Sequence, residues 1–178
     1  GRGTRPERDG YAGGRVVGCA VWVRVATRPH TFDRCFVRVL VDAPCSGTGT
    51  LSRNPEISGR IQITDILELH EKQTLLVHQA LLALGADGRL VYSTCSLEPE
   101  ENQQVIDLAL APHSNHEYQV LDCAGELQKL QAAGELTWPD RGSLTREKFL
   151  TTLPGTHPCD GFFADLIERR AYKPIGFE

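Results

Sequence analysis

The stretch FVRVLVDAPC, residues 36–45, sets the interpretation of the whole sequence. Residues 36–41 are apolar except for Arg38. A short, nearly continuous apolar run is typical of a strand in a parallel sheet that is covered on both faces. Asp42 and Cys45 come directly after this run. We therefore predict a buried strand with an acid and a thiol at its C-terminal end.

A long helix and a second strand follow. Apolar side chains recur at three- and four-residue spacing over 65–84, which predicts an amphipathic helix. Thr64 or Asp65 is placed to cap this helix, and Gly85 is placed to end it. RLVYST, residues 89–94, then predicts a second buried strand. A strand, a helix and a strand form a βαβ unit, in which the two strands are parallel and share one sheet.

The two predicted strands end in similar motifs. Residues 42–45 follow the first strand, and residues 93–96 follow the second. In a parallel pair both C-terminal ends open on the same edge of the sheet, where open α/β sheets bind ligands. We therefore expect Cys45 and Cys95 to be neighbours in space.

The remaining segments are less regular. Residues 98–111 predict a shorter helix with Pro99 in its first turn. Residues 117–122 favour a strand, the stretch up to about residue 158 is punctuated by Gly and Pro, and 161–169 predict a final strand.

The first residues have a different composition from the rest. Residues 1–14 are rich in Gly, Arg and charge, which is typical of disorder. Residues 15–24 are compatible with a strand that Gly18 weakens. We divide the chain into an atypical or disordered lead-in, 1–34, and a second part, 35–178.

Composition limits the class of protein. The chain has 178 residues, of which 40% are hydrophobic and 24% are charged, as in a soluble globular domain. No apolar run is long enough for a membrane span and no signal-peptide pattern is present, so a cytoplasmic location is expected. The net charge of −4 is unlike that of an autonomous nucleic-acid binder. Any contact with RNA would then depend on a local basic cluster or on a region outside this chain.

The cysteine pattern disfavours metal sites and disulfides. No two cysteines have the C-x-x-C spacing of structural zinc sites, and nothing indicates secretion. We expect no metal, which leaves catalytic or inert thiols. The six cysteines are at positions 19, 35, 45, 95, 123 and 159.

Four motifs together resemble the Sun (Fmu) family of RNA cytosine-5 methyltransferases, the RsmB-like enzymes that modify small-subunit ribosomal RNA. The resemblance extends over residues 36–169. It implies an α/β, Rossmann-like fold for S-adenosylmethionine-dependent methyltransfer, here incomplete at its N-terminus. It also implies S-adenosylmethionine as cofactor and RNA, most simply ribosomal RNA, as partner. The motifs are DAPCSGTG (42–49), NPEI (54–57), YSTCSLEPEEN (92–102) and HPCDGFF (157–163).

The chemistry of this family explains why two thiols are needed. Carbon 5 of cytosine is a poor nucleophile until a thiolate adds at carbon 6. By resemblance, Cys95 of the Thr-Cys pair is the nucleophile, and Cys45 of the Pro-Cys pair assists product release. Asp42 matches the aspartate that lies against the cofactor and the target base. Cys95 precedes a predicted helix N-terminus, whose partial positive charge would favour the thiolate.

Other polar residues near the motifs have weaker assignments. Arg53 and Asn54 follow the first strand in a loop and are candidates for binding the RNA substrate. We interpret Glu100, Glu101 and Asn102 as the first turn of a helix rather than as ligands.

Part of the family pattern is missing from this sequence. The family's glycine-rich cofactor loop, the acidic residues that follow it and an upstream lysine have no visible counterpart. We therefore expect the C-terminal portion of a catalytic domain, with little activity alone.

Two alternatives stay open. DNA cytosine-5 methyltransferases attack with a Pro-Cys cysteine, but a Thr-Cys at the end of the next strand is not part of their pattern. A non-catalytic RNA-binding or scaffolding remnant of the same fold would explain the acidic charge and the missing loop. That alternative does not explain why both thiols are present.

Overall fold

The computed structural model describes residues 36–113 and 117–170, so the expected lead-in and the strand predicted over 15–24 lie outside it. The described residues form one mixed sheet in the order β1-β2-β6-β5-β4, with β3 paired to β6 beside this path. The strands are β1 (Phe36–Asp42), β2 (Leu84–Thr94), β3 (Tyr118–Val120), β4 (Thr145–Arg146), β5 (Phe149–Thr152) and β6 (Phe162–Arg169). The α-helices are α1 (Ile63–Ala83), α2 (Gln103–Leu110) and α3 (Cys123–Ala132). Short 3-10 turns occur at η1 (Thr48–Thr50), η2 (Pro55–Gly59), η3 (Pro99–Glu101) and η4 (Arg141–Leu144).

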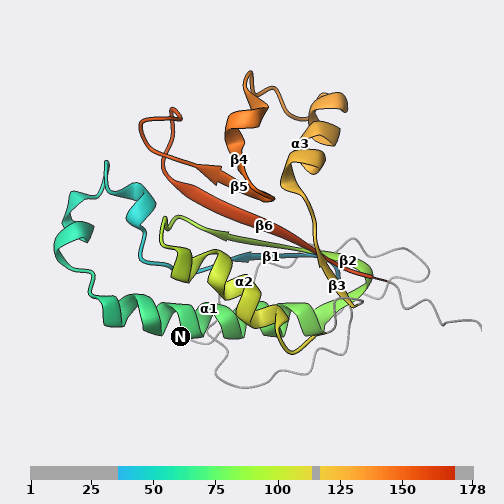
Figure 1. Ribbon diagram of the computed structural model, residues 1–178, viewed down its shortest axis with the longest axis horizontal. Coiled ribbons are helices and arrows are strands. Elements are labelled where there is room, and N and C mark those ends of the chain that lie inside the picture. The colour runs from blue at the N-terminus through green and yellow to red at the C-terminus, as the bar shows by residue number, and fades with distance from the viewer. Residues whose placement is uncertain (1–35, 114–116, 171–178) are drawn as a thin grey trace, which may run out of the picture.

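The predicted βαβ unit is confirmed. Strands β1 and β2 are parallel and adjacent, with α1 as the connection between them. Their register ends at the pair Asp42 and Ser93, so both strands finish at the same level. The C-terminal ends therefore share one edge of the sheet, at the left of Figure 1.

The predicted ends of the long helix were wrong. Gln62 is the N-cap of α1, and Asp65 is its third residue, whose carboxylate accepts the backbone N–H of Gln62 at 2.9 Å. This reciprocal capping box satisfies backbone donors that have no partner inside the helix. The helix ends at Ala83, before Gly85, because Leu84 already adopts an extended conformation and begins β2.

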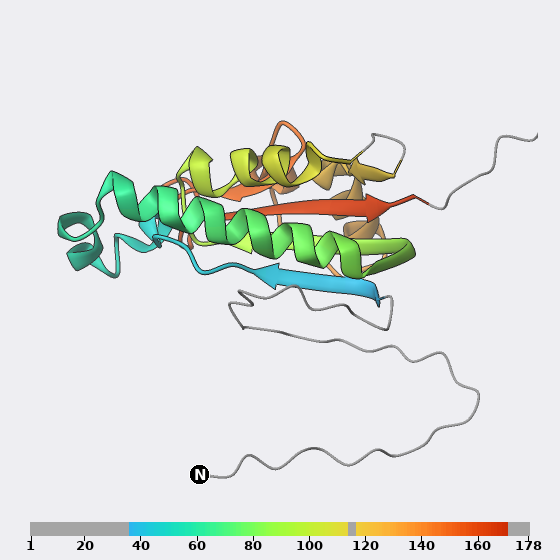
Figure 2. The ribbon, with the colours of Figure 1, turned by 90° about the horizontal axis from the view of Figure 1, so that it is seen from below.

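Helices α1 and α2 lie side by side over one face of the sheet (Figure 2). The core forms between these helices, β2 and β6. Burying a leucine or isoleucine side chain here contributes roughly 1.5–3 kcal/mol, so this layer supplies the main stabilisation. Fully or almost fully buried members are Val77, Leu81, Leu84, Leu90, Tyr92, Val105, Ile106 and Ile167.

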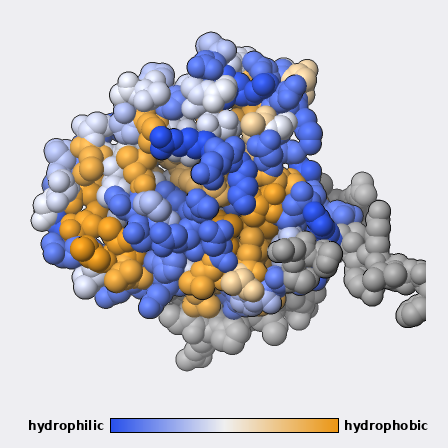
Figure 3. Space-filling model, in the orientation of Figure 1, coloured by the Kyte–Doolittle hydropathy of each residue, from blue (hydrophilic) through white to orange (hydrophobic). Residues whose placement is uncertain are grey.

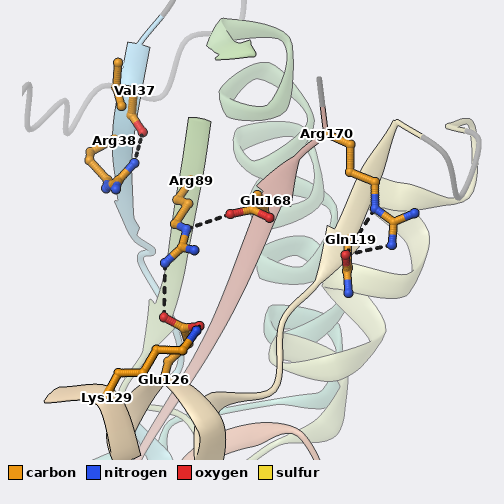
Figure 4. A network of polar contacts seen from close by, with 8 residues as sticks. All are labelled: Val37, Arg38, Arg89, Gln119, Glu126, Lys129, Glu168 and Arg170. Atoms are coloured by element: carbon orange, nitrogen blue, oxygen red, sulfur yellow. Dashed lines mark hydrogen bonds and ion pairs between the residues drawn. The ribbon is translucent and has the colours of Figure 1, made fainter. Parts of the chain in front are cut away.

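Helix α3 lies on the other side of the sheet, where polar contacts attach it to β2 (Figure 4). Arg89 on β2 donates to Glu168 on β6 at 2.8 Å and to Glu126 on α3 at 3.0 Å. Lys129 also donates to Glu126, at 2.6 Å. Such partly exposed ion pairs contribute less than about 1 kcal/mol each, so they orient α3 more than they stabilise it.

Two predictions about burial and regular structure were wrong. Strand β1 is not covered on both faces, since Val37 and Leu40 are 60% and 42% exposed. In the described residues β1 is at the end of the sheet and pairs with β2 alone.

The stretch 123–158 contains α3, β4 and β5 rather than irregular chain. Helix α3 was missed because it buries few apolar side chains, although Asp122 caps it by accepting from the N–H of Ala124.

The C-terminal segments follow the predictions more closely. The strand predicted over 117–122 is the shorter β3, and the final predicted strand is β6. Strand β6 runs antiparallel to β2 and lies between β2 and β5.

Backbone contacts between two glycines join the loops at the C-terminal edge. The N–H of Gly49 donates to the carbonyl of Cys95 at 2.9 Å, and the N–H of Gly161 donates to the carbonyl of Gly49 at 2.8 Å. A Cβ at Gly49 would lie 2.7 Å from the Cys95 carbonyl oxygen and closer still to that of Gly161. The loops after β1 and β2 and the loop before β6 are therefore packed backbone to backbone.

Gly49→Ala should lower the free energy of unfolding by about 2 kcal/mol or more, because the added methyl group meets backbone atoms that cannot rotate away. Urea unfolding followed by circular dichroism measures this change. Gly59→Ala is the matched control, since a Cβ there meets nothing within 4 Å. Equal stabilities of the two variants would contradict the close packing.

A second stability prediction concerns Asp165, which is 1% exposed and faces Tyr92 across β2 and β6. Its Oδ1 accepts the N–H of Leu166 at 2.8 Å. Its Oδ2 has no hydrogen-bond partner among the described residues. Burial raises the pKa of Asp165 to about 6, from an ordinary value of 3.8. The folded chain therefore favours the neutral acid. The stability that this one group contributes is present below about pH 4 and is lost as the pH rises through about 6.

Asp165→Asn should raise the free energy of unfolding at neutral pH by about 2 kcal/mol and change it little near pH 4, because the amide stays neutral. Urea unfolding at both pH values tests this, with the exposed Glu56→Gln as control, since Glu56 is not among the groups that shift the pKa of Asp165. A pH-independent effect of Asp165→Asn would show that ionisation is not the cause.

Candidate active site

The two cysteines of the strand-end motifs lie together, as the parallel pairing predicts. Cys45 follows β1, Cys95 follows β2, and their sulfur atoms are 3.3 Å apart. Both side chains are half-buried. At this distance the two sulfurs are hydrogen-bonded, so a change at one cysteine affects the other.

The surroundings of Cys45 favour its neutral form. Burial raises the pKa of the Cys45 thiol to about 12, and the hydrogen bond with Cys95 adds to this rise. At neutral pH Cys45 is therefore a thiol. At 3.3 Å it can hydrogen-bond to Cys95, and either sulfur can be the donor.

The helix predicted to follow Cys95 is shorter than expected. A 3-10 turn, η3, comes first, and α2 begins at Gln103. The pyrrolidine of Pro99 is tolerated at the start of η3 because its missing N–H needs no partner there. An effect of the helix N-terminus on the Cys95 thiol stays a prediction.

Asp42 stands at the open end of β1, three residues before Cys45. Its Oδ1 accepts the hydroxyl of Ser93 at 2.9 Å, and Ser93 is its direct partner in the parallel register. The side chain is exposed. Asp42 is thus oriented by a neighbouring strand while its carboxylate stays accessible to a bound molecule.

The two candidate RNA-binding residues have different surroundings. Arg53 forms a two-point ion pair with Asp160, with Nε 3.1 Å from Oδ1, and its side chain is 74% exposed. Asn54 is half-buried and donates to Thr50 Oγ1 at 3.0 Å. Arg53 keeps an accessible surface, whereas Asn54 is engaged in supporting its own loop. A role of either residue in RNA binding stays a prediction.

Glu101 lies in the turn η3 that leads into α2, close to the predicted first turn of a helix, but its side chain also has contacts that the sequence analysis did not predict. Glu101 is completely buried, and its carboxylate accepts from Ser46, Ser96 and Gln73. Asn102 is also buried. The sequence did carry one signal, because the dipeptide Cys-Ser occurs in both motifs and both serine hydroxyls reach Glu101.

The side chain of Asn102 holds the segment that contains Cys95. Its Nδ2 donates to the carbonyl of Ser96 at 2.9 Å, and its Oδ1 accepts the hydroxyl of Thr94 at 2.6 Å. Thr94 and Ser96 flank Cys95. The Thr-Cys-Ser segment is therefore held on both sides of its cysteine by consecutive residues of one turn.

The surface beside this edge is partly apolar. Hydrophobic side chains gather around the η1–η2 segment and the start of α1, at the lower left of Figure 3. Leu51, Ile63 and Leu67 are among the exposed apolar residues of this part of the chain. Within the described ranges, no helix is long and apolar enough to cross a membrane, and no group of His, Cys, Asp and Glu side chains could hold a metal ion.

Comparison with known proteins places these features in one family. A family model described as 16S rRNA methyltransferase RsmB/F matches residues 19–168, starting upstream of the motifs. Ribosomal RNA small subunit methyltransferase F of Vibrio cholerae is 36% identical over 146 residues, or 82% of this chain and 28% of that protein. The probable ribosomal RNA small subunit methyltransferase B of Coxiella burnetii is 35% identical over 132 residues, or 74% of this chain and 27% of that protein. The chain thus spans less than a third of the length of these relatives.

Solved structures agree with the observed fold. The crystal structure of PH0851 superposes with a TM-score of 0.61 at 30% identity, covering 75% of this chain and 27% of that one. A methyltransferase homolog protein from Pyrococcus horikoshii gives 0.53 at 31% identity, covering 77% of this chain and 40% of that one. The mixed sheet with its helix layers is therefore a Rossmann-like methyltransferase fold.

The raised pKa of Cys45 predicts its reactivity. At about pH 8, iodoacetamide should modify Cys45 at least about tenfold more slowly than the exposed Cys159, because the thiolate is the reactive form. Cys95→Ala removes the sulfur that raises this pKa, so it should shift the pH profile of Cys45 alkylation to lower pH. Mass spectrometry of labelled peptides between about pH 7 and 10 follows both rates. A Cys45 rate equal to that of Cys159 would contradict the raised pKa of Cys45.

Proposed function

The chain belongs to the RsmB/F family of 16S rRNA methyltransferases, and on that premise we propose that it is the C-terminal portion of an RNA cytosine-5 methyltransferase domain. The observation that carries the proposal is the pair of sulfurs 3.3 Å apart at the shared ends of two parallel strands. A pair of thiols at this edge suits covalent catalysis on a base presented there.

In the proposed reaction Cys95 is the nucleophile. Its sulfur adds to carbon 6 of the cytosine, and the electron pair of the 5,6 double bond becomes available at carbon 5. S-adenosylmethionine, when bound, supplies an electrophilic methyl group to carbon 5. A base then takes the carbon-5 proton, the C–H electron pair re-forms the 5,6 double bond, and the C6–S bond breaks so that the sulfur of Cys95 leaves as a thiolate.

Cys45 has the complementary role of assisting release. Its raised pKa keeps a proton on the sulfur that lies 3.3 Å from Cys95. Before attack, this S–H donates to Cys95 and stabilises negative charge on it. When the adduct breaks down, the same thiol is placed to return a proton to the departing sulfur.

The described residues fit a methyl donor in part. Asp42 presents an oriented, accessible carboxylate beside the cysteine pair, where it would contact the cofactor and the target base. A counterpart of the family's glycine-rich cofactor loop, which would cradle the rest of the cofactor, is not found among residues 36–113 and 117–170. We propose accordingly that this chain has little activity by itself and works with the remainder of the domain.

The substrate of the proposed reaction is ribosomal RNA in the cytoplasm. Two relatives are named as methyltransferases of small-subunit ribosomal RNA, which supports this substrate class. The guanidinium of Arg53, in the loop between η1 and η2, is exposed and would contact a phosphate near the site from its ion pair with Asp160. Asn54 would contribute indirectly, because its hydrogen bond to Thr50 supports the conformation of that loop.

A second candidate is a non-catalytic RNA-binding or scaffolding protein of the same fold. The net charge of −4 favours a scaffolding role over direct RNA binding, because phosphate binding usually needs a basic surface. The two candidates can be distinguished by a reaction that needs the Cys95 nucleophile but no methyl donor. The ring nitrogen of 5-azacytosine makes carbon 6 electrophilic, so a thiolate can add there without a methyl donor.

The purified chain should form a denaturant-resistant adduct with small-subunit ribosomal RNA that contains 5-azacytidine. Cys95→Ala should abolish the adduct, because it removes the sulfur that bonds to carbon 6. Cys45→Ala should keep or increase it, because release is impaired. Gel mobility and mass mapping of the linked peptide measure the adduct, and the exposed Cys159→Ala is the control.

Two other outcomes of the adduct experiment would support different mechanisms. Loss of the adduct with Cys45→Ala but not with Cys95→Ala would indicate the mechanism of DNA cytosine-5 methyltransferases. A folded chain that forms no adduct would favour the non-catalytic candidate.

A further inference from the structure

One buried carboxylate joins the two loops that carry the cysteines. Glu101 Oε1 accepts the backbone N–H of Ser46 at 2.8 Å. Its Oε2 accepts the hydroxyls of Ser46 and Ser96, the latter at 2.5 Å. Ser46 directly follows Cys45, and Ser96 directly follows Cys95. The side chain of Glu101 is therefore hydrogen-bonded to the residue that follows each of the two cysteines.

The carboxylate is itself fixed by rigid elements. Gln73 on α1 donates from Nε2 to Glu101 Oε1 at 3.0 Å and to the carbonyl of Pro44 at 2.8 Å. The hydroxyl of Tyr92 on β2 donates to the backbone carbonyl of Glu101 at 2.6 Å. Hydrogen bonds to a charged acceptor are short and strong, especially away from water. Glu101 therefore connects both loops to the helix and the strand beneath them.

We propose that Glu101 is a positioning residue that sets the separation of the Cys45 and Cys95 sulfurs. The proposal deepens the proposed function and rests on it for its catalytic meaning. Glu101 acts through the two serines, since its bonds are to their hydroxyls and to one backbone N–H. Without the carboxylate, the N–H of Ser46 loses its acceptor, and the two serines keep only the direct contact between their hydroxyls at 3.2 Å, beside the backbone contact of Gly49 with Cys95.

The sulfur separation can be measured without RNA or a methyl donor. In oxidised dithiothreitol, the thiolate of one cysteine attacks the cyclic disulfide and opens it to a mixed disulfide. The second cysteine then displaces reduced dithiothreitol, so two protein thiols become one disulfide and one reagent disulfide becomes two thiols. The equilibrium constant reports how closely the two sulfurs are held in the folded chain.

Glu101→Ala should shift this equilibrium at least about tenfold toward the reduced thiols, a change of about 30 mV. Glu101→Gln should stay within about threefold of the unchanged chain, because its amide can accept from the Ser46 N–H and donate to both hydroxyls. Glu100→Ala is the matched control, since the neighbouring Glu100 side chain forms none of these bonds. Mass spectrometry with fragmentation quantifies the Cys45–Cys95 link, and circular dichroism confirms folding.

A folded Glu101→Ala variant with an unchanged equilibrium constant would overturn the proposal. So would a Glu101→Gln variant as impaired as Glu101→Ala, because the charge rather than the position would then matter. If Glu101→Ala does not fold, the double variant Ser46→Ala/Ser96→Ala replaces it, with a shift of several-fold expected and no shift overturning the proposal. The result is independent of the 5-azacytidine adduct, so failure of one experiment does not decide the other.

Discussion

The parallel pairing of Asp42 with Ser93 at the ends of β1 and β2 is the constraint on which the site depends. Because both strands finish at one level, the residues that follow them begin from adjacent positions. The backbone of Ala43 extends the ladder by donating to the carbonyl of Ser93. From there the two loops run together to the cysteine pair. A shift of one residue in this register would move each loop and turn every side chain of the strand to the opposite face.

The loops after β1 and β2 place Cys45 where its thiol is stabilised. Burial and the hydrogen bond with Cys95 raise the pKa of Cys45, so this sulfur keeps its proton at neutral pH. A mechanism that needs both a sulfur nucleophile and a proton donor for its release is served by such a pair. The rise in the pKa of Cys45 comes first from its burial and then from its contact with Cys95. The same loops position both sulfurs, so a change in either loop would alter both functions.

The sequence was informative where the relevant pattern was local. The period of α1 and the apolar runs of β1 and β2 predicted the βαβ unit, and the unit in turn predicted that Cys45 and Cys95 are neighbours. The burial of Glu101 could not be predicted in this way, because its partner Ser46 is 55 residues distant and an acid after a proline usually caps a helix. The exposure of Leu40 was missed for a related reason. An apolar strand carries no signal that says which strands and helices cover it.

The position of β6 has a consequence for how the chain acquires this structure. This strand comes last in the described sequence, yet it lies between β2 and β5 and pairs with β3 as well. Its preceding loop brings Gly161 against Gly49, across more than half of the chain. During synthesis from the N-terminus, the cysteines leave the ribosome well before the strand that completes the sheet. Until β6 inserts, β2 lacks one neighbour, and the nascent chain must keep that strand edge from pairing elsewhere.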